Sequence, residues 1–306
     1  MGASLNLRNR IHHAFFLGLS VECGGLGLKE TGKRMVSRVH LISGLPRSGS
    51  TLLCALLRQN PRFTAAMTSP VAALCGGLMQ NMSGASEFAT FFSDERRAAI
   101  LRSVFDAYYA HVPADHVVFD TNRTWTSKAA LLSMLYPRAR IICCVREVSW
   151  IIDSVERQVR KNALQPSRLF GYKSSGTVYS RVETLMNPEN GLIGLAWSSL
   201  REAWFSEFAD RLIVIDYDRL VSAPEQTIAS LYRELDEVPY AHDFEHVVYD
   251  EPDYDAQLGI PGMHTVRPKV EARKRVSCVP PDVFSKYADT NFWLNTKMNH
   301  RQVTVL

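Results

Sequence analysis

The sequence has no long apolar runs, no paired cysteines and little excess charge. Among its 306 residues no apolar run approaches the roughly 20 residues of a membrane-spanning helix, so we expect none. The six cysteines form no C-x-x-C pair, and two of them are neighbours inside an apolar run. This spacing fits neither a zinc site nor a disulfide framework, and it predicts reduced thiols in a reducing, cytoplasmic compartment.

The net charge of +4 is concentrated at one end of the chain. Residues 1–40 carry six basic and two acidic side chains, whereas from residue 41 onward there are 29 of each sign. A neutral body argues against a protein that coats nucleic acid. We expect residues 1–37 to be a flexible extension, or to include a mis-assigned start with Met35 as the natural one. Residues 38–306 would then be a single domain.

Short apolar runs alternate with segments of helical periodicity. The run at 140–145 has no polar alternation, as expected for a strand buried on both faces of a parallel sheet. The alternation predicts an α/β fold, a three-layer sandwich with a central parallel sheet. Strands are expected at 39–43, 116–119, 140–145 and 212–216, and helices at 51–59, 95–111, 129–136, 148–165, 195–208 and 224–235.

A glycine-containing turn over residues 44–51 joins the first expected strand to the next helix. Backbone N–H groups of such a turn, together with the positive end of the helix dipole, form a cradle for an anion such as phosphate. Ser50 and Thr51 add hydroxyl groups. The Walker pattern of kinases and other NTPases requires Lys directly after its second Gly. Here that position is Ser50, and Arg47 is the cation in the loop.

The turn resembles the 5′-phosphosulfate loop of sulfotransferases that use 3′-phosphoadenosine 5′-phosphosulfate (PAPS). Their pattern P-[KR]-[SA]-G-[ST]-[ST]-x-L is matched by residues 46–53. Arg146 ends an apolar run and Ser154 lies eight positions further on, which is similar to the family's 3′-phosphate site. Tyr217, followed by Asp-Arg-Leu and then Pro224, is similar to the element whose tyrosine lies against the nucleotide base.

The resemblance implies that PAPS is the sulfuryl donor, that 3′-phosphoadenosine 5′-phosphate (PAP) is the product, and that no metal is required. The basic run at 264–275 is similar to a late loop of the family that folds over the nucleotide. The residues 280–283 that follow it are similar to those of tyrosylprotein sulfotransferases, within an otherwise bacterial type of chain. Nucleotide-binding roles are thereby expected for Arg47, Ser48, Gly49, Ser50, Thr51, Arg146, Ser154, Tyr217, Arg267 and Lys269.

Catalysis requires stabilisation of charge on the departing phosphate oxygen, a role expected for Arg47. It also requires a base for the acceptor's proton. The family takes this base from a His after the second strand or a Glu after the first helix, and neither is matched here. Asp120, at a strand end, is the candidate base, and His264 is a weaker candidate. Arg123 is a candidate to steady the sulfuryl group.

The acceptor is expected to carry a hydroxyl group. A peptide tyrosine is slightly favoured, and a sugar, a lipid or a small phenol stays open, as does the oligomeric state. The long segments 64–90 and 164–190 are expected to be irregular acceptor-binding loops. The segment 234–255 has nine acidic and no basic residues, which indicates a solvated face or a basic partner. The alternatives are a P-loop kinase or NTPase that lacks its lysine, and a nucleotide-binding protein without catalysis.

Overall fold

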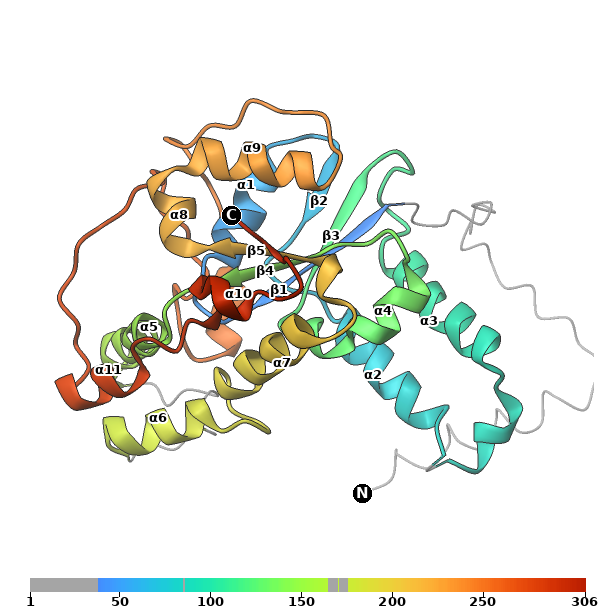
Figure 1. Cartoon of the computed structure of the whole chain (residues 1–306), viewed down its shortest axis with the longest axis horizontal. Coiled ribbons are helices and arrows are strands. Elements are labelled where there is room, and N and C mark those ends of the chain that lie inside the picture. The colour runs from blue at the N-terminus through green and yellow to red at the C-terminus, as the bar shows by residue number, and fades with distance from the viewer. Residues whose placement is uncertain (1–37, 85, 165–169, 171–175) are drawn as a thin grey trace, which may run out of the picture. The chain divides into compact units, whose positions relative to one another are not determined.

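Six parallel strands form one sheet in the order β2-β3-β1-β4-β5-β6 (Figure 1). The computed structural model describes residues 38–306 except 85, 165–169 and 171–175, so the expected extension at 1–37 lies outside the described residues. The strands are β1 (Val39–Gly44), β2 (Phe63–Ala65), β3 (Val117–Thr121), β4 (Ile141–Val145), β5 (Leu212–Asp216) and β6 (Thr304–Val305).

Helices cover both faces of the sheet. In Figure 1, α1, α8 and α9 lie on one side, and α4 and α7 lie on the other. This arrangement confirms the predicted α/β sandwich. The helices are α1 (Ser50–Leu57), α2 (Val71–Asn81), α3 (Asp94–Tyr108), α4 (Ala129–Leu135), α5 (Val148–Lys161), α6 (Val178–Met186), α7 (Gly194–Phe205), α8 (Tyr217–Ser222), α9 (Pro224–Glu234), α10 (Pro252–Gln257) and α11 (Pro281–Tyr287). Over the described ranges no helix has the length and apolarity that crossing a membrane requires.

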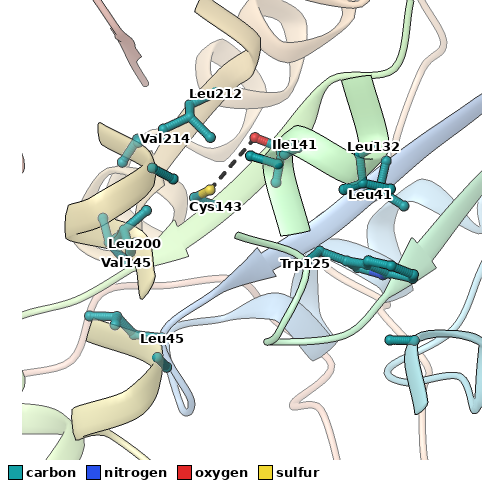
Figure 2. Close-up of a cluster of buried hydrophobic side chains, with 14 of the residues drawn as sticks. Leu41, Leu45, Trp125, Leu132, Ile141, Cys143, Val145, Leu200, Leu212 and Val214 are labelled. Atoms are coloured by element: carbon teal, nitrogen blue, oxygen red, sulfur yellow. Dashed lines mark hydrogen bonds between the residues drawn. The ribbon is translucent and has the colours of Figure 1, made fainter. Parts of the chain in front are cut away.

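The central strands are apolar on both faces because alternate side chains enter two different cores. In β4, Ile141, Cys143 and Val145 belong to one core, and Ile142 and Cys144 belong to the other. Figure 2 shows the first of these cores, where the Cys143 Sγ lies 3.6 Å from the carbonyl oxygen of Ile141. Burial raises the pKa of the Cys143 and Cys144 thiols. These cysteines therefore pack as small apolar side chains.

Several elements differ from the sequence-based expectation. The strands β2 and β6 were not expected, because three and two residues are too few to show a hydrophobic pattern. The expected loops at 64–90 and 164–190 contain α2 and α6, respectively. In α2 the adjacent Gly76 and Gly77 weaken the helical signal, because glycine is a poor helix former.

A charged side chain, Asp120, is fully buried near the end of β3. Its Oδ2 accepts hydrogen bonds from the Ser69 hydroxyl at 2.5 Å and the Tyr109 hydroxyl at 2.6 Å. Its Oδ1 accepts one from the Trp125 indole at 2.7 Å. Burial raises the pKa of Asp120, and the three donors oppose that shift. The carboxyl group thus links β3 to Tyr109 at the end of α3, to Ser69 before α2 and to Trp125 before α4.

Replacing Asp120 by Ala would leave three buried donors without their acceptor. We expect the free energy of unfolding to fall by about 3 kcal/mol or more, because each unsatisfied buried group costs about 1–3 kcal/mol. Urea denaturation measures the change. The exposed Asp115→Ala control should lose less than about 0.5 kcal/mol. A loss for Asp120→Ala as small as that of the control would contradict this account of the β3 end.

Candidate functional site

A cavity of about 530 Å³ lies at the carboxyl ends of the parallel strands. Its walls come from the loop after β1, from the ends of β2 to β5, and from the segment 254–275. Parallel α/β sheets bind ligands at this edge, because the loops that follow neighbouring strands converge there.

The loop after β1 is shaped by two glycines with positive φ. Gly44 (φ 98°) ends β1, where a Cβ atom would lie 2.3 Å from the carbonyl oxygen of Cys144. Gly49 (φ 90°) caps α1. Between them Arg47 also has a positive φ, 59°. The turn therefore directs backbone N–H groups and the positive end of α1 toward one place, as an anion cradle requires.

Arg47 joins three segments that are far apart in the sequence. Its Nε donates a hydrogen bond to the Ser154 hydroxyl at 3.1 Å, and a terminal nitrogen donates to the carbonyl oxygen of Met263. Burial lowers the pKa of Arg47, and the nearby Tyr217 and Asp255 raise it. The structure thus brings the expected residues Arg47 and Ser154 into direct contact.

Arg146 and Tyr217, both expected at the site, stack on each other. The Arg146 guanidinium lies over the Tyr217 ring, 4.2 Å from its centre. A Cβ atom on Gly49 would lie 2.9 Å from Cδ2 of Tyr217, so the ring packs closely against the loop. The Arg146 Nε is buried and has no hydrogen-bond partner within the described residues. The guanidinium therefore retains unused capacity to bind an anion.

Arg275 is a further arginine in the cavity wall, beside Arg47 and Arg146, and it was not among the residues expected from the sequence. Its guanidinium lies over the Trp150 ring, 5.1 Å from the centre, and its Nε is 3.7 Å from the Asp153 carboxylate. One of its terminal nitrogens is buried and makes no hydrogen bond in the described part of the chain. Burial lowers the pKa of Arg146, and the charge of Arg275 lowers it further. Arg275 lowers the pKa of Arg47 as well.

Arg267 and Lys269 also line the cavity, but both are exposed. The Lys269 ammonium pairs with Glu245 at 2.8 Å. Of the cations in the basic run at 264–275, Arg275 is the one with a buried nitrogen that lacks a hydrogen-bond partner among the described residues. The only sequence signal for Arg275 was its membership of that run.

His264 lines the same cavity and is held by a buried carboxylate. Its Nδ1 lies 2.5 Å from Oδ1 of Asp255, and its backbone N–H donates to Oδ2 of that residue at 2.8 Å. The Asp255 side chain is fully buried. This pairing leaves Nε2 as the ring nitrogen not engaged by Asp255. In the sequence Asp255 was simply the last member of the acidic segment 234–255.

Asp120, the residue expected to act as the base, is not part of the cavity wall. Its carboxyl group has no exposed surface and is occupied by three donors. This environment does not fit a group that must reach an acceptor. Arg123, three residues further on, does line the cavity. No group of three or more His, Cys, Asp or Glu in the described ranges could hold a metal ion.

This chain is similar to several solved structures at low sequence identity. They include a sulfotransferase from Alicyclobacillus acidocaldarius, 15% identical, with a TM-score of 0.47, covering 73% of this chain and 90% of that one. Another is the sulfotransferase domain of the Synechococcus PCC 7002 olefin synthase, 18% identical, with a TM-score of 0.41 and coverage of 76% and 90%. A third is the sulfotransferase domain from the curacin biosynthetic pathway, 18% identical, with a TM-score of 0.44 and coverage of 68% and 76%.

No curated protein matches the sequence. The sequence pattern of the sulfotransferase family, however, matches residues 41–241. This match covers well over half of the 306 residues, from within β1 to beyond α9, and includes the glycine loop, Arg146, Ser154 and Tyr217. The chain therefore belongs to the sulfotransferase family.

Proposed function

We propose that this protein transfers a sulfuryl group from PAPS to the hydroxyl group of an acceptor and releases PAP. The observation that carries the proposal is the convergence of Arg47, Arg146 and Arg275 on one cavity, where Arg146 and Arg275 have buried nitrogens without a partner among the described residues. Mutually repelling cations with spare donors suit a ligand with two separate anionic groups, as in PAPS. The family membership supports the same chemistry.

We assign the two phosphate positions from the groups at the ends of β1 and β4. The loop after β1, with Arg47, would hold the 5′-phosphosulfate, because it contains the anion cradle. Arg146 after β4, Ser154 on α5 and Arg275 would hold the 3′-phosphate. Tyr217 keeps the Arg146 guanidinium in place and offers the rest of its ring to the nucleotide base.

Bound PAPS supplies the sulfuryl group and the phosphate that leaves with the electron pair of the broken S–O bond. Arg47, the loop N–H groups and the hydroxyls of Ser50 and Thr51 stabilise the charge that develops on that phosphate oxygen. Arg146 and Ser154 fix the position of the nucleotide, so that the acceptor oxygen lies in line with the breaking bond.

We assign the role of base to His264, whose Nε2 would accept the proton of the acceptor's hydroxyl group. Asp255 accepts a hydrogen bond from Nδ1–H, which leaves Nε2 without a proton and free to take one as the acceptor oxygen bonds to sulfur. The contact of Arg47 with the carbonyl of Met263 joins the segment that carries this base to the phosphate loop. Asp255 acts here as a positioning residue, because it touches His264 and lies outside the cavity wall.

Among acceptors, the likeness of residues 280–283 to tyrosylprotein sulfotransferases slightly favours a peptide tyrosine over a sugar, a lipid or a small phenol.

A thermal-shift screen tests the donor class most simply. We expect PAP and PAPS to raise the melting temperature of the protein, and ATP–Mg²⁺ and GTP–Mg²⁺ to leave it unchanged. A shift with ATP–Mg²⁺ and none with PAP would replace this proposal by a kinase or another NTPase. Binding of PAP without transfer to any acceptor would indicate a nucleotide-binding protein.

Arg146→Ala and Arg275→Ala test the proposed 3′-phosphate site. Each removes charged donors from the ligand, so we expect PAP affinity to fall about tenfold to hundredfold. Isothermal titration calorimetry measures the change. Arg138→Ala is the matched control, because Arg138 is exposed and outside the cavity wall. Unchanged PAP affinity in both site variants would remove these residues from the site.

His264→Gln tests the assignment of the base. We expect kcat to fall about a hundredfold or more, while PAP affinity is retained, because the variant loses proton acceptance and no phosphate contact. Asp255→Asn should lower kcat and leave the acceptor KM and the PAP affinity unchanged, a split that a purely structural role would not produce. The exposed His300→Gln is the control, and a wild-type kcat in His264→Gln would rule out this assignment.

A further inference from the structure

The order of the strands divides the cavity into two halves. With β1 in the middle, β4 and β5 lie on one side and β3 and β2 on the other. The residues proposed to bind the nucleotide follow β1, β4 and β5. The half of the cavity at the ends of β3 and β2 is therefore left for the acceptor. The residues from these two strand ends that line the cavity are 67–69 and 121–123.

Arg123 is the charged residue in this acceptor half. Two polar neighbours are occupied within the protein, since the Ser69 hydroxyl donates to Asp120 and the Asn122 Oδ1 accepts from Thr124. The Arg123 guanidinium makes no hydrogen bond or ion pair with any residue that the structure describes, although it lies in the cavity wall. Its charge is therefore available to a ligand.

The position of Arg123 is fixed through its backbone. The Ser43 hydroxyl at the end of β1 donates to the carbonyl oxygen of Arg123 at 3.0 Å and accepts from the N–H of Thr126 at 3.3 Å. The Arg123 side chain is exposed to solvent in the cavity wall. Partial desolvation lowers its pKa, and the neighbouring Tyr254 opposes this shift. The Tyr254 ring packs edge-on to the His264 ring, with their centres 5.6 Å apart. Arg123, Tyr254 and His264 all line the cavity.

We propose that Arg123 selects an acceptor that carries a negatively charged group, a carboxylate or a phosphate, in addition to its reacting hydroxyl. This inference rests on the proposed function, because it takes the nucleotide and the base as placed above. A guanidinium recognises either anion through paired N–H donors. Because Arg123 and His264 line the same cavity, an acceptor held by the guanidinium could present its hydroxyl to the base.

Matched acceptor pairs that differ only in charge test the proposal. The pairs are hydroxyphenylpropanoate and its methyl ester, hydroxybenzylphosphonate and its dimethyl ester, and blocked glutamyl-tyrosine and glutaminyl-tyrosine. Calorimetry on the PAP-saturated enzyme gives their affinities. We expect the charged member of at least one pair to bind about tenfold or more tightly than its neutral partner, as one charged hydrogen-bonded contact implies. The pair that responds identifies a carboxylate, a phosphate or an acidic peptide as the source of the charge.

Arg123→Gln should abolish this preference and leave both the affinity for the neutral partner and the affinity for PAP unchanged. Arg138→Gln, which removes the same charge outside the cavity wall, should keep the preference. Equal affinities within every pair, or no binding of any member, would overturn the proposal. Equal losses for charged and neutral acceptors in Arg123→Gln would also overturn it. Failure of the wild-type protein to bind PAP would instead contradict the proposed function.

Discussion

Three guanidinium groups meet at the carboxyl edge of the sheet, and the rest of the site is arranged around their repulsion. Arg275 lowers the pKa of both Arg47 and Arg146, so each cation is held near another with the same charge. The fold supports them with neutral contacts for the most part: the Ser154 hydroxyl, the Met263 carbonyl, and the rings of Tyr217 and Trp150. Such contacts fix geometry without neutralising charge. A ligand with two phosphate groups would supply the missing counter-charge.

The two apolar cores make this concentration of charge possible. Because β4 is buried on both faces, Arg146 at its end is carried by a rigid strand, and α5 then positions Ser154 two turns further on. Because Gly44 has no Cβ atom, the end of β1 can lie close to Cys144. The loop that follows then places Arg47 opposite Arg146 and Ser154. The charges thus come from loops, while their spacing is set by the sheet.

The sequence was sufficient for the four longer strands, β1, β3, β4 and β5, and for the motifs that form one half of the candidate site. Residues 140–145 form a strand buried on both faces, and the contact of Arg47 with Ser154 joins two motifs that were recognised separately. The remaining half depends on contacts between distant segments. Arg275 and Asp255 belonged to runs of like charge, and only the folded chain turns one toward the cavity and the other onto His264.

Asp120 illustrates the opposite error. A position at the end of a strand suggests access to the site, but side chains alternate along a strand, so the direction of each depends on the register. The register of β3 against β1 and β2 turns Asp120 toward Tyr109 and Trp125 in the protein interior. Arg123, beyond the strand end, lines the cavity instead. Proposing a base therefore required the partners of each carboxylate and imidazole, which no local pattern contains.

In the proposed function the clustered arginines recognise a second phosphate. Calorimetric titration of the wild-type protein with PAP and with adenosine 5′-phosphate, which lacks the 3′-phosphate, is the decisive test. We expect PAP to bind about a hundredfold or more tightly, with the difference decreasing as salt is added, because the additional contacts are ionic. Equal affinity for the two nucleotides would contradict it.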